Sequence, residues 1–325
     1  MLSSCLRSMP RHATLLSLAF ACLAAELPQR AEAQGPAWIA TFGGLGSAPG
    51  KFNLAHHMAI SSTTGNLYVG DLLNNRVQVL TSNGVFVRQW PLSGVDGIAV
   101  GRLDTVYAVA NDRVYKYTST GTLVTSWGGS GSGAGQFNFA MDVGVDSQGN
   151  VFVSDFLNRR IQKFNPAGAF LTQWGSEGAG PGQFETPIGV YVDSADNVWV
   201  GDGGNNRVQK FSPSGDYLFG FGTQGTGPGQ WESPGRPCID ANGFLLVPDA
   251  GNARIQVYTP AGQFVLQWGS LGTANGQFNH PLIVATDPGG NVFVLDKDNS
   301  RVQKFADIAT ASVHRSWGAL KSRYR

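Results

Sequence analysis

Short apolar segments separated by turn-forming residues run along most of the chain, and one stretch shows the arrangement in full. The segments PIGVYVD (187–193), NVWVGD (197–202), RVQKF (207–211) and YLFGFG (217–222) are rich in β-branched and aromatic residues, with Gly, Pro, Asn, Asp and Ser between them. This pattern predicts four consecutive β-strands, here denoted a to d. Strand b has apolar side chains at both alternating positions, which is typical of a strand covered on both faces. After residue 33, no segment shows a sustained helical period.

The four-strand unit recurs along the chain at a nearly fixed spacing. Near copies of NNRVQKF (205–211) each contain one arginine, and these arginines are Arg76, Arg113, Arg160, Arg207, Arg254 and Arg301. The first interval is 37 residues and the other four are 47. Self-similarity at this period indicates a solenoid, a propeller or an array, and strands covered on both faces favour the propeller. The sequence therefore predicts an all-β fold, a six-bladed β-propeller of four-stranded antiparallel blades.

Two irregularities bear on how the ring closes. The segments AWIATFGG (37–44) and SVHRSWG (312–318) both resemble strand d, so seven candidates serve six blades. We expect the N-terminal segment to pair beside the sixth repeat and close the ring, which leaves one candidate surplus. The second repeat (91–117) lacks the GQF lead-in and has Ala110 where the other repeats have aspartate. We expect this blade to be the least stapled and the most open.

An aspartate precedes the repeated arginine by five residues in five of the six repeats. These pairs are Asp71 and Arg76, Asp155 and Arg160, Asp202 and Arg207, Asp249 and Arg254, and Asp296 and Arg301. A carboxylate at the b–c turn can accept amide hydrogens, and a guanidinium can bind a carboxylate through two donors. We interpret the pairs as structural staples, within a blade or between neighbours, and Arg207→Ala should lower stability sharply. The alternative is a ring of ligand-binding arginines.

These landmarks together resemble the NHL repeat. The resemblance rests on G-x-G-x-G-Q-F, then P-x-G-V-x-V-D, then N-V-x-V-x-D-x-x-N-x-R-I/V-Q-K-F, then G-x-F-x-x-x-W-G, and it covers about residues 37–318. The Gly-His and Trp-Asp pairs of WD40 repeats do not occur, and the paired glycines of kelch repeats are not at the expected strand end. The resemblance implies the same six-bladed fold that the spacing predicts.

The N-terminal segment 1–33 has the order of a secretory signal peptide. Arg7 and Arg11 precede an apolar run (13–25), and a small-residue site ends at Ala33. We therefore divide the chain into a signal peptide (1–33) and a propeller (34–325), and expect an exported protein in the periplasm or outside the cell.

The charge balance narrows the partners of the exported chain. Segment 1–33 contains three of the 23 basic and two of the 22 acidic residues, so 20 of each remain. This balance argues against nucleic acid, whose binders have a basic excess. No second long apolar run is present, so we expect no integral membrane segment. Cys238 is the single cysteine left, which excludes an intramolecular disulfide.

The start of strand a is the expected position for chemistry, because this strand lines the central channel of a propeller. His56, His57, Asp96 and Asp142 occupy this position in three consecutive repeats. Imidazole and carboxylate ligands suit zinc, or calcium where water and carbonyls assist, so these four residues form a candidate metal site. The alternative is polar side chains at a water-filled mouth that bind no ligand.

One enzyme class among the six-bladed relatives can be tested on the sequence. The resemblance extends to the peptide-amidating lyases, whose zinc is held by histidines from different blades. Here the matching positions of the third to sixth repeats hold other residues, namely Met141, Ile188, Gly235 and Leu282, so that histidine set is absent.

Three functional hypotheses remain. The first is a binding or scaffold module that presents its loop face to a protein, peptide or glycan. The alternative is a metal-assisted lyase or hydrolase at the channel mouth, and the third is a structural component of the envelope. The periodic aromatic positions resemble a sugar platform, but their blade period favours packing; they are Phe52, Phe137, Phe184, Trp231 and Phe278.

Overall fold

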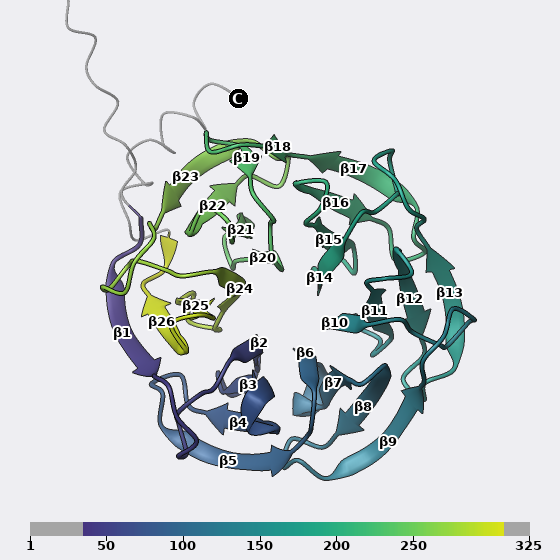
Figure 1. Ribbon diagram of the computed structural model, residues 1–325, viewed down its shortest axis with the longest axis horizontal. Helices are drawn as coiled ribbons and strands as arrows, with labels where there is room; N and C mark the ends of the chain where they lie inside the picture. Colours follow the sequence, from purple (N-terminus) through teal and green to yellow (C-terminus); the bar gives the residue numbers. More distant parts are fainter. Residues whose placement is uncertain (1–34, 309–325) are drawn as a thin grey trace, which may run out of the picture. The chain divides into compact units, whose positions relative to one another are not determined.

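The computed structural model describes residues 35–308 and contains six four-stranded antiparallel sheets arranged around a central axis (Figure 1). The signal-peptide segment (1–33) and the surplus d-like segment (312–318) lie outside the described residues. The predicted all-β fold and the number of blades are confirmed. No helix in the described part of the chain has the length and apolar character needed to cross a membrane.

Each blade has an inner, a second, a third and an outer strand. The inner strands are β2 (Ala55–Ile60), β6 (Val95–Val100), β10 (Ala140–Val145), β14 (Pro187–Val192), β20 (Cys238–Ile239) and β24 (Pro281–Thr286). The second strands are β3 (Leu67–Asp71), β7 (Val106–Ala110), β11 (Val151–Asp155), β15 (Val198–Asp202), β21 (Leu245–Asp249) and β25 (Val292–Asp296). All six second strands are buried throughout, as their two-sided apolar pattern predicts.

The third and outer strands complete the blades. The third strands are β4 (Arg76–Leu80), β8 (Arg113–Tyr117), β12 (Arg160–Phe164), β16 (Arg207–Phe211), β22 (Arg254–Tyr258) and β26 (Arg301–Phe305). The outer strands are β5 (Phe86–Pro91), β9 (Leu123–Gly128), β13 (Phe170–Trp174), β17 (Tyr217–Phe221), β23 (Phe264–Trp268) and, for the sixth blade, β1 (Trp38–Gly43). We number the blades 1 to 6 from β2 onward. Short additional elements are η1 (Leu72–Asn74), η2 (Arg102–Asp104), β18 (Thr223–Gln224) and β19 (Gln230–Trp231).

The ring is closed by the two ends of the described chain. Strand β1 pairs antiparallel with β26, with Trp38 opposite Phe305 and Gly43 opposite Arg301. The N-terminal d-like segment therefore supplies the outer strand of the last blade, which confirms the expected closure. The four-stranded order β1-β26-β25-β24 results, so every blade has four strands.

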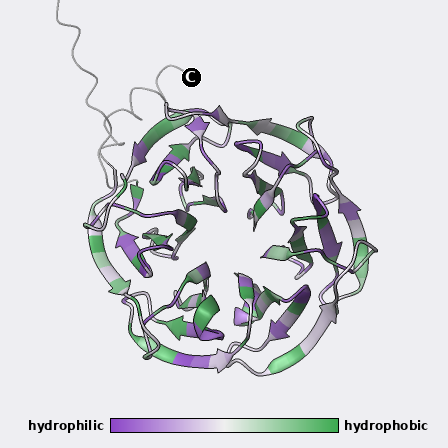
Figure 2. Ribbon diagram, viewed as in Figure 1, coloured by the Kyte–Doolittle hydropathy of each residue, from purple (hydrophilic) through white to green (hydrophobic). Residues whose placement is uncertain are grey.

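The hydrophobic core lies between neighbouring blades, and Figure 2 shows hydrophobic stretches in all six of them. One cluster joins Tyr68 and Val77 of blade 1 to Ile98 and Val106 of blade 2, and equivalent clusters follow around the ring. Stacking of this kind covers both faces of each sheet, which is why one blade alone would leave apolar surface in water.

Two of the periodic sequence landmarks touch each other across blades. Gly121, in the turn between β8 and β9, has a φ of +89° and lies so close to Trp90 of the preceding blade that a Cβ atom would be 2.5 Å from the indole. The same close approach joins Gly168 to Trp127 and Gly215 to Trp174. Only glycine provides both the left-handed backbone and this space. The glycine and the aromatic residue therefore keep the same period because each contact needs both.

The fold has two different faces, which we name by their connections. The loop face has the connections from each outer strand to the next inner strand and from each second to each third strand. The turn face has the connections from inner to second and from third to outer strands. On the loop face, only three residues (92–94) join β5 to β6, whereas eleven (129–139) join β9 to β10. Blade 2 therefore lacks the long crossing loop of its neighbours.

Candidate functional site

The four residues of the predicted metal site form two separate pairs. His57 Nε2 lies 2.7 Å from Asp142 Oδ1, whereas His56 Nδ1 lies 3.1 Å from the carbonyl oxygen of Asp96 and 3.8 Å from its Oδ1. His56 lies in a β-bulge of β2, where the register shifts between Ala55 and His57, and each of the two imidazoles contacts a different aspartate. Within residues 35–308, no group of three or more His, Cys, Asp or Glu side chains is arranged to hold a metal ion.

A third residue joins His57 and Asp142 at the centre of the ring. Arg236 Nε lies 3.4 Å from Asp142 Oδ2 and donates a hydrogen bond of 3.0 Å to the carbonyl of Val190. The three side chains come from blades 1, 3 and 5 and are almost completely buried, with exposed fractions of 2% for His57, 1% for Asp142 and 8% for Arg236. We call these three residues the axial network.

The intervening blades contribute backbone to the axial network. The amide of Ile98 in blade 2 donates to His57 Nδ1 at 3.1 Å, and the amide of Val190 in blade 4 donates to Asp142 Oδ2 at 2.7 Å. Such contacts require small residues beside the network. Cβ atoms at Gly97 or Gly189 would lie 2.7 Å from the Cα of Asp142 or 2.4 Å from the Cα of Arg236. At this level of the channel, the large polar residues of blades 1, 3 and 5 therefore alternate with glycine in blades 2 and 4, and blade 6 has Ile283.

The protonation of the axial network follows from its hydrogen bonds. Because His57 Nδ1 accepts from an amide, the single imidazole proton belongs on Nε2, beside Asp142. The N–H direction is poorly aligned with the carboxylate oxygen despite the short distance, since Nε2 has no hydrogen bond of good geometry. Burial lowers the pKa of His57, and the neighbouring Asp142 opposes this effect only in part. A neutral histidine beside a carboxylate that is paired with a guanidinium leaves the network without net charge.

The axial network is poorly suited to a metal ion. Asp142 Oδ1 also accepts the amide of Val143, so both of its carboxylate oxygens already have donors. Arg236 adds a fixed positive charge next to the same carboxylate, which repels a divalent cation. The axial network is thus a charge-balanced group of paired side chains, and it fits zinc or calcium poorly.

The second pair, His56 and Asp96, lies closer to the loop face and has shifted pKa values. Burial lowers the pKa of His56 to about 4, although its hydrogen bond to the Asp96 carbonyl opposes the shift. Burial also raises the pKa of Asp96 to about 6, and the charge of Asp112 adds to this effect. At neutral pH the pair is therefore an uncharged imidazole beside a carboxylate.

The five Asp and Arg pairs lie within single blades, and they also hold the loop that enters the blade. Their Nε to Oδ2 distances range from 2.6 to 3.0 Å. In blade 3, Arg160 Nη2 also donates to the carbonyls of Gly133 and Gln136, at 2.8 and 3.0 Å. In blade 2, Arg113 has no aspartate partner within the described residues and makes one long contact of 3.5 Å to Ser126 Oγ. The paired arginines therefore hold parts of the fold together, and they lie away from the channel.

A cavity of about 500 Å³ lies on the turn-face side of the axial network. All six blades line it, and it reaches the surface between the exposed turn residues Ser62, Ser194, Ala241 and Pro288. Three of the inner strands contribute alanine at the same level, which leaves the space open. These residues are Ala59, Ala99 and Ala285. The volume is within the usual range for small-molecule sites.

The titratable side chains around this cavity include no activated nucleophile at neutral pH among the described residues. Burial raises the pKa of Tyr191 to about 12 and raises the pKa of the Cys238 thiol strongly. Asp240 Oδ2 is buried without a hydrogen-bond partner among the described residues, and burial raises the pKa of this carboxyl. Arg236 also lines the cavity. Neither a role for Arg236 nor the cavity was predicted from the sequence.

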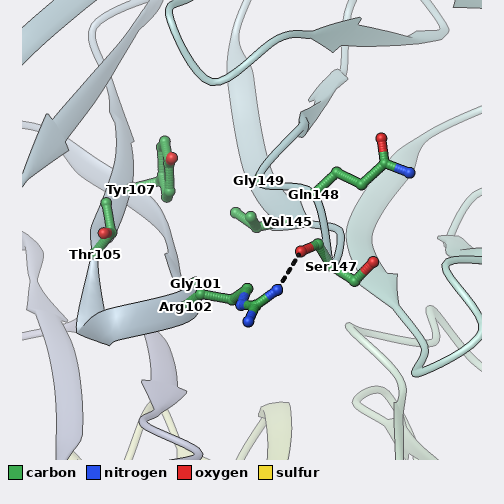
Figure 3. Close-up of a pocket in the computed structure, with 8 residues that line it drawn as sticks. All are labelled: Gly101, Arg102, Thr105, Tyr107, Val145, Ser147, Gln148 and Gly149. Atoms are coloured by element: carbon green, nitrogen blue, oxygen red, sulfur yellow. Dashed lines mark hydrogen bonds between the residues drawn. The ribbon is translucent and has the colours of Figure 1, made fainter.

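A second pocket of about 400 Å³ lies between blades 2 and 3 on the turn face (Figure 3). Its wall includes Tyr107 and Val145, and Arg102 Nη1 reaches across to the carbonyl of Ser147 at 3.5 Å. It is lined by only two blades, and the central cavity by six.

The periodic aromatic residues are packing residues, because all five are fully buried. They are Phe52, Phe137, Phe184, Trp231 and Phe278. They are therefore unavailable as a sugar platform.

Comparisons with known proteins agree with this architecture. The NHL repeat family matches residues 184–211 and 278–305, so the chain contains NHL repeats. The sequence has no significant match among curated proteins.

Three solved structures illustrate the likeness in fold. A virginiamycin B lyase from Staphylococcus aureus has a TM-score of 0.56 and 16% identity, over 77% of this chain and 79% of that one. A gluconolactonase from Xanthomonas campestris has a TM-score of 0.61 and 15% identity, over 83% and 96%. A protein of unknown function from Bacteroides thetaiotaomicron has a TM-score of 0.64 and 17% identity, over 82% and 76%. At these identities the likeness concerns the fold alone.

Proposed function

We propose that the protein is a binding module that holds a small ligand in the central cavity of the turn face. The observation that carries this proposal is the cavity itself, about 500 Å³ in volume and lined by all six blades. Its walls combine apolar residues such as Val100 and Val192 with a few polar groups, including Thr286 and Arg236. Concave sites with this mixture are typical of small-molecule binding.

Binding is favoured over catalysis because the cavity offers no activated group among the described residues. The Cys238 thiol and the Tyr191 hydroxyl stay protonated at neutral pH, since burial raises both pKa values. A thiol needs its thiolate form to act as a nucleophile. His57 Nδ1 accepts from the amide of Ile98, and its Nε2 lies 2.7 Å from Asp142 Oδ1, so neither ring nitrogen is free. The similar folds of a lyase and a gluconolactonase do not transfer their chemistry to this chain.

The test uses one bulky substitution at two positions. Ala241 is exposed and lines the cavity, whereas Ala195 is exposed in the matching turn of blade 4 and does not line it. Ligands are first found by thermal-shift screening of a small-molecule set on the native protein. We expect Ala241→Trp to abolish stabilisation by these ligands and Ala195→Trp to leave it unchanged. Equal responses of the two variants, or a screen without ligands, would contradict the proposal.

A second function, binding of a protein or peptide partner, is favoured by apolar side chains on the loop face. Leu45, Leu73, Phe139, Leu157 and Leu271 are all exposed there, in connections that precede inner strands or join second to third strands. Exposed apolar side chains are a common feature of protein interaction sites, and these five belong to connections of the same face. This face is less suited to bind a glycan, because the periodic aromatic residues of the loops are buried.

This second function predicts a difference between the two faces. We expect Leu73→Asp and Leu157→Asp to reduce cross-linking to a partner in cells that produce the protein. Leu103, which is 89% exposed on the turn face, provides the control substitution Leu103→Asp. The same loss of cross-linking in all three variants would argue against a loop-face partner.

We also propose that the protein acts outside the cytoplasm, because residues 1–33 have the order of a signal peptide. N-terminal sequencing of the protein from the exported fraction should begin at Gln34. A chain that retains segment 1–33 and stays in the cytoplasm would contradict export.

A further inference from the structure

Arg236 is a buried cation that uses only part of its hydrogen-bonding capacity. Its side chain is about nine-tenths buried, and Nε donates to the carbonyl of Val190. Neither of its two terminal Nη groups donates to an acceptor within residues 35–308. A guanidinium has five N–H donors in a planar fork. Neither Nη atom is among the buried side-chain atoms that lack a partner, so both keep contact with solvent and can donate to a ligand, which makes them a candidate binding element.

The surroundings direct this fork into the central cavity. Nε faces Val190 and Asp142, and Arg236 is one of the residues that line the cavity. The guanidinium carbon also lies 5.6 Å from the ring centroid of Tyr191, another wall residue. A cation above an aromatic ring is held in orientation by the π-system. The fork is therefore preorganised, which lowers the entropic cost of binding a planar anion.

The charges around the cavity select the kind of anion. Arg236 is the one basic side chain among the described residues that line it, whereas Asp240 and Asp287 are acidic lining residues. Asp287 Oδ2 lies 3.9 Å from Lys304 Nζ, and burial raises the pKa of Asp240, so these two carboxyl groups repel an anion less than their number suggests. A dianionic phosphate would still meet more repulsion than a ligand with a single negative charge. A carboxylate has a single charge and two oxygens with the spacing of the guanidinium fork.

The remaining wall defines the body of the ligand. Apolar side chains line the space between the fork and the mouth, among them Ile60, Val100, Val145 and Ile239. This surface suits an alkyl or aryl group, whose burial is favourable.

We propose that the central cavity binds the carboxylate of a small acid with an apolar body, and that Arg236 is the residue that recognises it. This inference rests on the proposed function, because it names the ligand class of the same cavity. The carboxylate can belong to a free acid or to the C-terminus of a peptide, and both would use the same fork.

The experiment compares isosteric probes by isothermal titration calorimetry on the full exported chain. Benzoate and benzamide differ in charge but hardly in shape, and phenyl phosphate adds charge. We expect benzoate to bind about 10- to 100-fold more tightly than benzamide, the range expected for a charge-assisted pair. Arg236→Gln should bring benzoate down to the level of benzamide. Arg102→Gln is the control, since Arg102 lies on the same face but lines the other pocket.

Each outcome has a defined meaning, including one for a variant that does not fold. Equal affinity for benzoate and benzamide in the native protein, or tighter binding of phenyl phosphate, overturns carboxylate recognition without any variant. If both probes bind equally and Ala241→Trp abolishes both, the cavity function survives and this inference fails. If no probe binds up to about 10 mM and the ligand screen is also empty, both fail. A dipeptide that binds more tightly than benzoate, while its C-terminal amide does not bind, supports carboxylate recognition and identifies a peptide C-terminus as its source.

Discussion

Removal of the Arg207 side chain tests whether the Asp and Arg pairs hold the blades together. Arg207 Nε donates to Asp202 Oδ2 at 3.0 Å, and its Nη groups donate to the carbonyls of Ala179, Gly180 and Gln183 at 2.6 to 2.9 Å. Arg207→Ala would leave a fully buried carboxylate and three loop carbonyls without this donor. Breaking a buried pair costs about 3–5 kcal/mol. Because the arginine side chain is 16% exposed and Asp202 keeps other donors, we expect about 3 kcal/mol, near the lower limit.

The chain itself provides the matched control for this measurement. Arg113 occupies the same position in blade 2 but has no aspartate partner among the described residues and one contact of 3.5 Å, so Arg113→Ala should cost less than about 1 kcal/mol. Both free energies are obtained from urea unfolding followed by tryptophan fluorescence, with equal m-values as the requirement for comparison. If the two substitutions differ by less than about 1 kcal/mol, the pairs do not act as staples and the reasoning is refuted.

Three further predictions concern the channel. Burial lowers the pKa of His56 from 6.5 to about 4, so in this window the unfolded chain binds a proton that the folded chain does not, and acidification destabilises the protein. Burial raises the pKa of Asp96 from 3.8 to about 6, so here the folded chain binds the extra proton and acidification stabilises it. The assay is urea unfolding at a series of pH values. His56→Gln should make the loss of stability between pH 6.5 and 4 smaller, and Asp96→Asn should make it larger. If the unfolding free energy changes with pH as in the native protein, both pKa shifts are contradicted. Gly97→Ala places a methyl group 2.7 Å from the Cα of Asp142, which should cost about 1–3 kcal/mol in the same assay, and full stability would exclude this close approach. After dialysis, elemental analysis should find no stoichiometric zinc or calcium, because the buried Arg236 cation lies beside Asp142. One equivalent of metal per chain that is lost in the His57→Ala variant would contradict this interpretation.

The architecture could be predicted from the sequence because several sequence features repeat with the same period. The turn glycine and the outer-strand aromatic touch across blades, as Gly121 and Trp90 do, so a change in the spacing of either would break a contact. Chain-end closure was accessible for a similar reason, since β1 has the composition of an outer strand and no blade of its own. Local periodicity of this kind reports the fold directly.

The candidate site was less accessible because it depends on relations between distant blades. The predicted grouping of His56 with His57 did not take account of the β-bulge between Ala55 and His57, and in the structure each imidazole contacts a different aspartate. The sequence does contain a signal for the axial network, since Gly97 and Gly189 occupy the same inner-strand position as Asp142. The cavity depends on how closely six inner strands approach, and residue types alone do not determine that distance.

The pairing of β1 with β26 has a consequence for biogenesis. Among the described strands, β1 is synthesised first and finds its partner last, because Trp38 and its neighbour Phe305 lie near opposite ends of the described chain. Until that moment two unpaired strand edges remain available to other chains, and long-range pairing of this kind is slow. Aggregation during synthesis and refolding should therefore depend more on how quickly β1 pairs with β26 than on the stability of any individual blade.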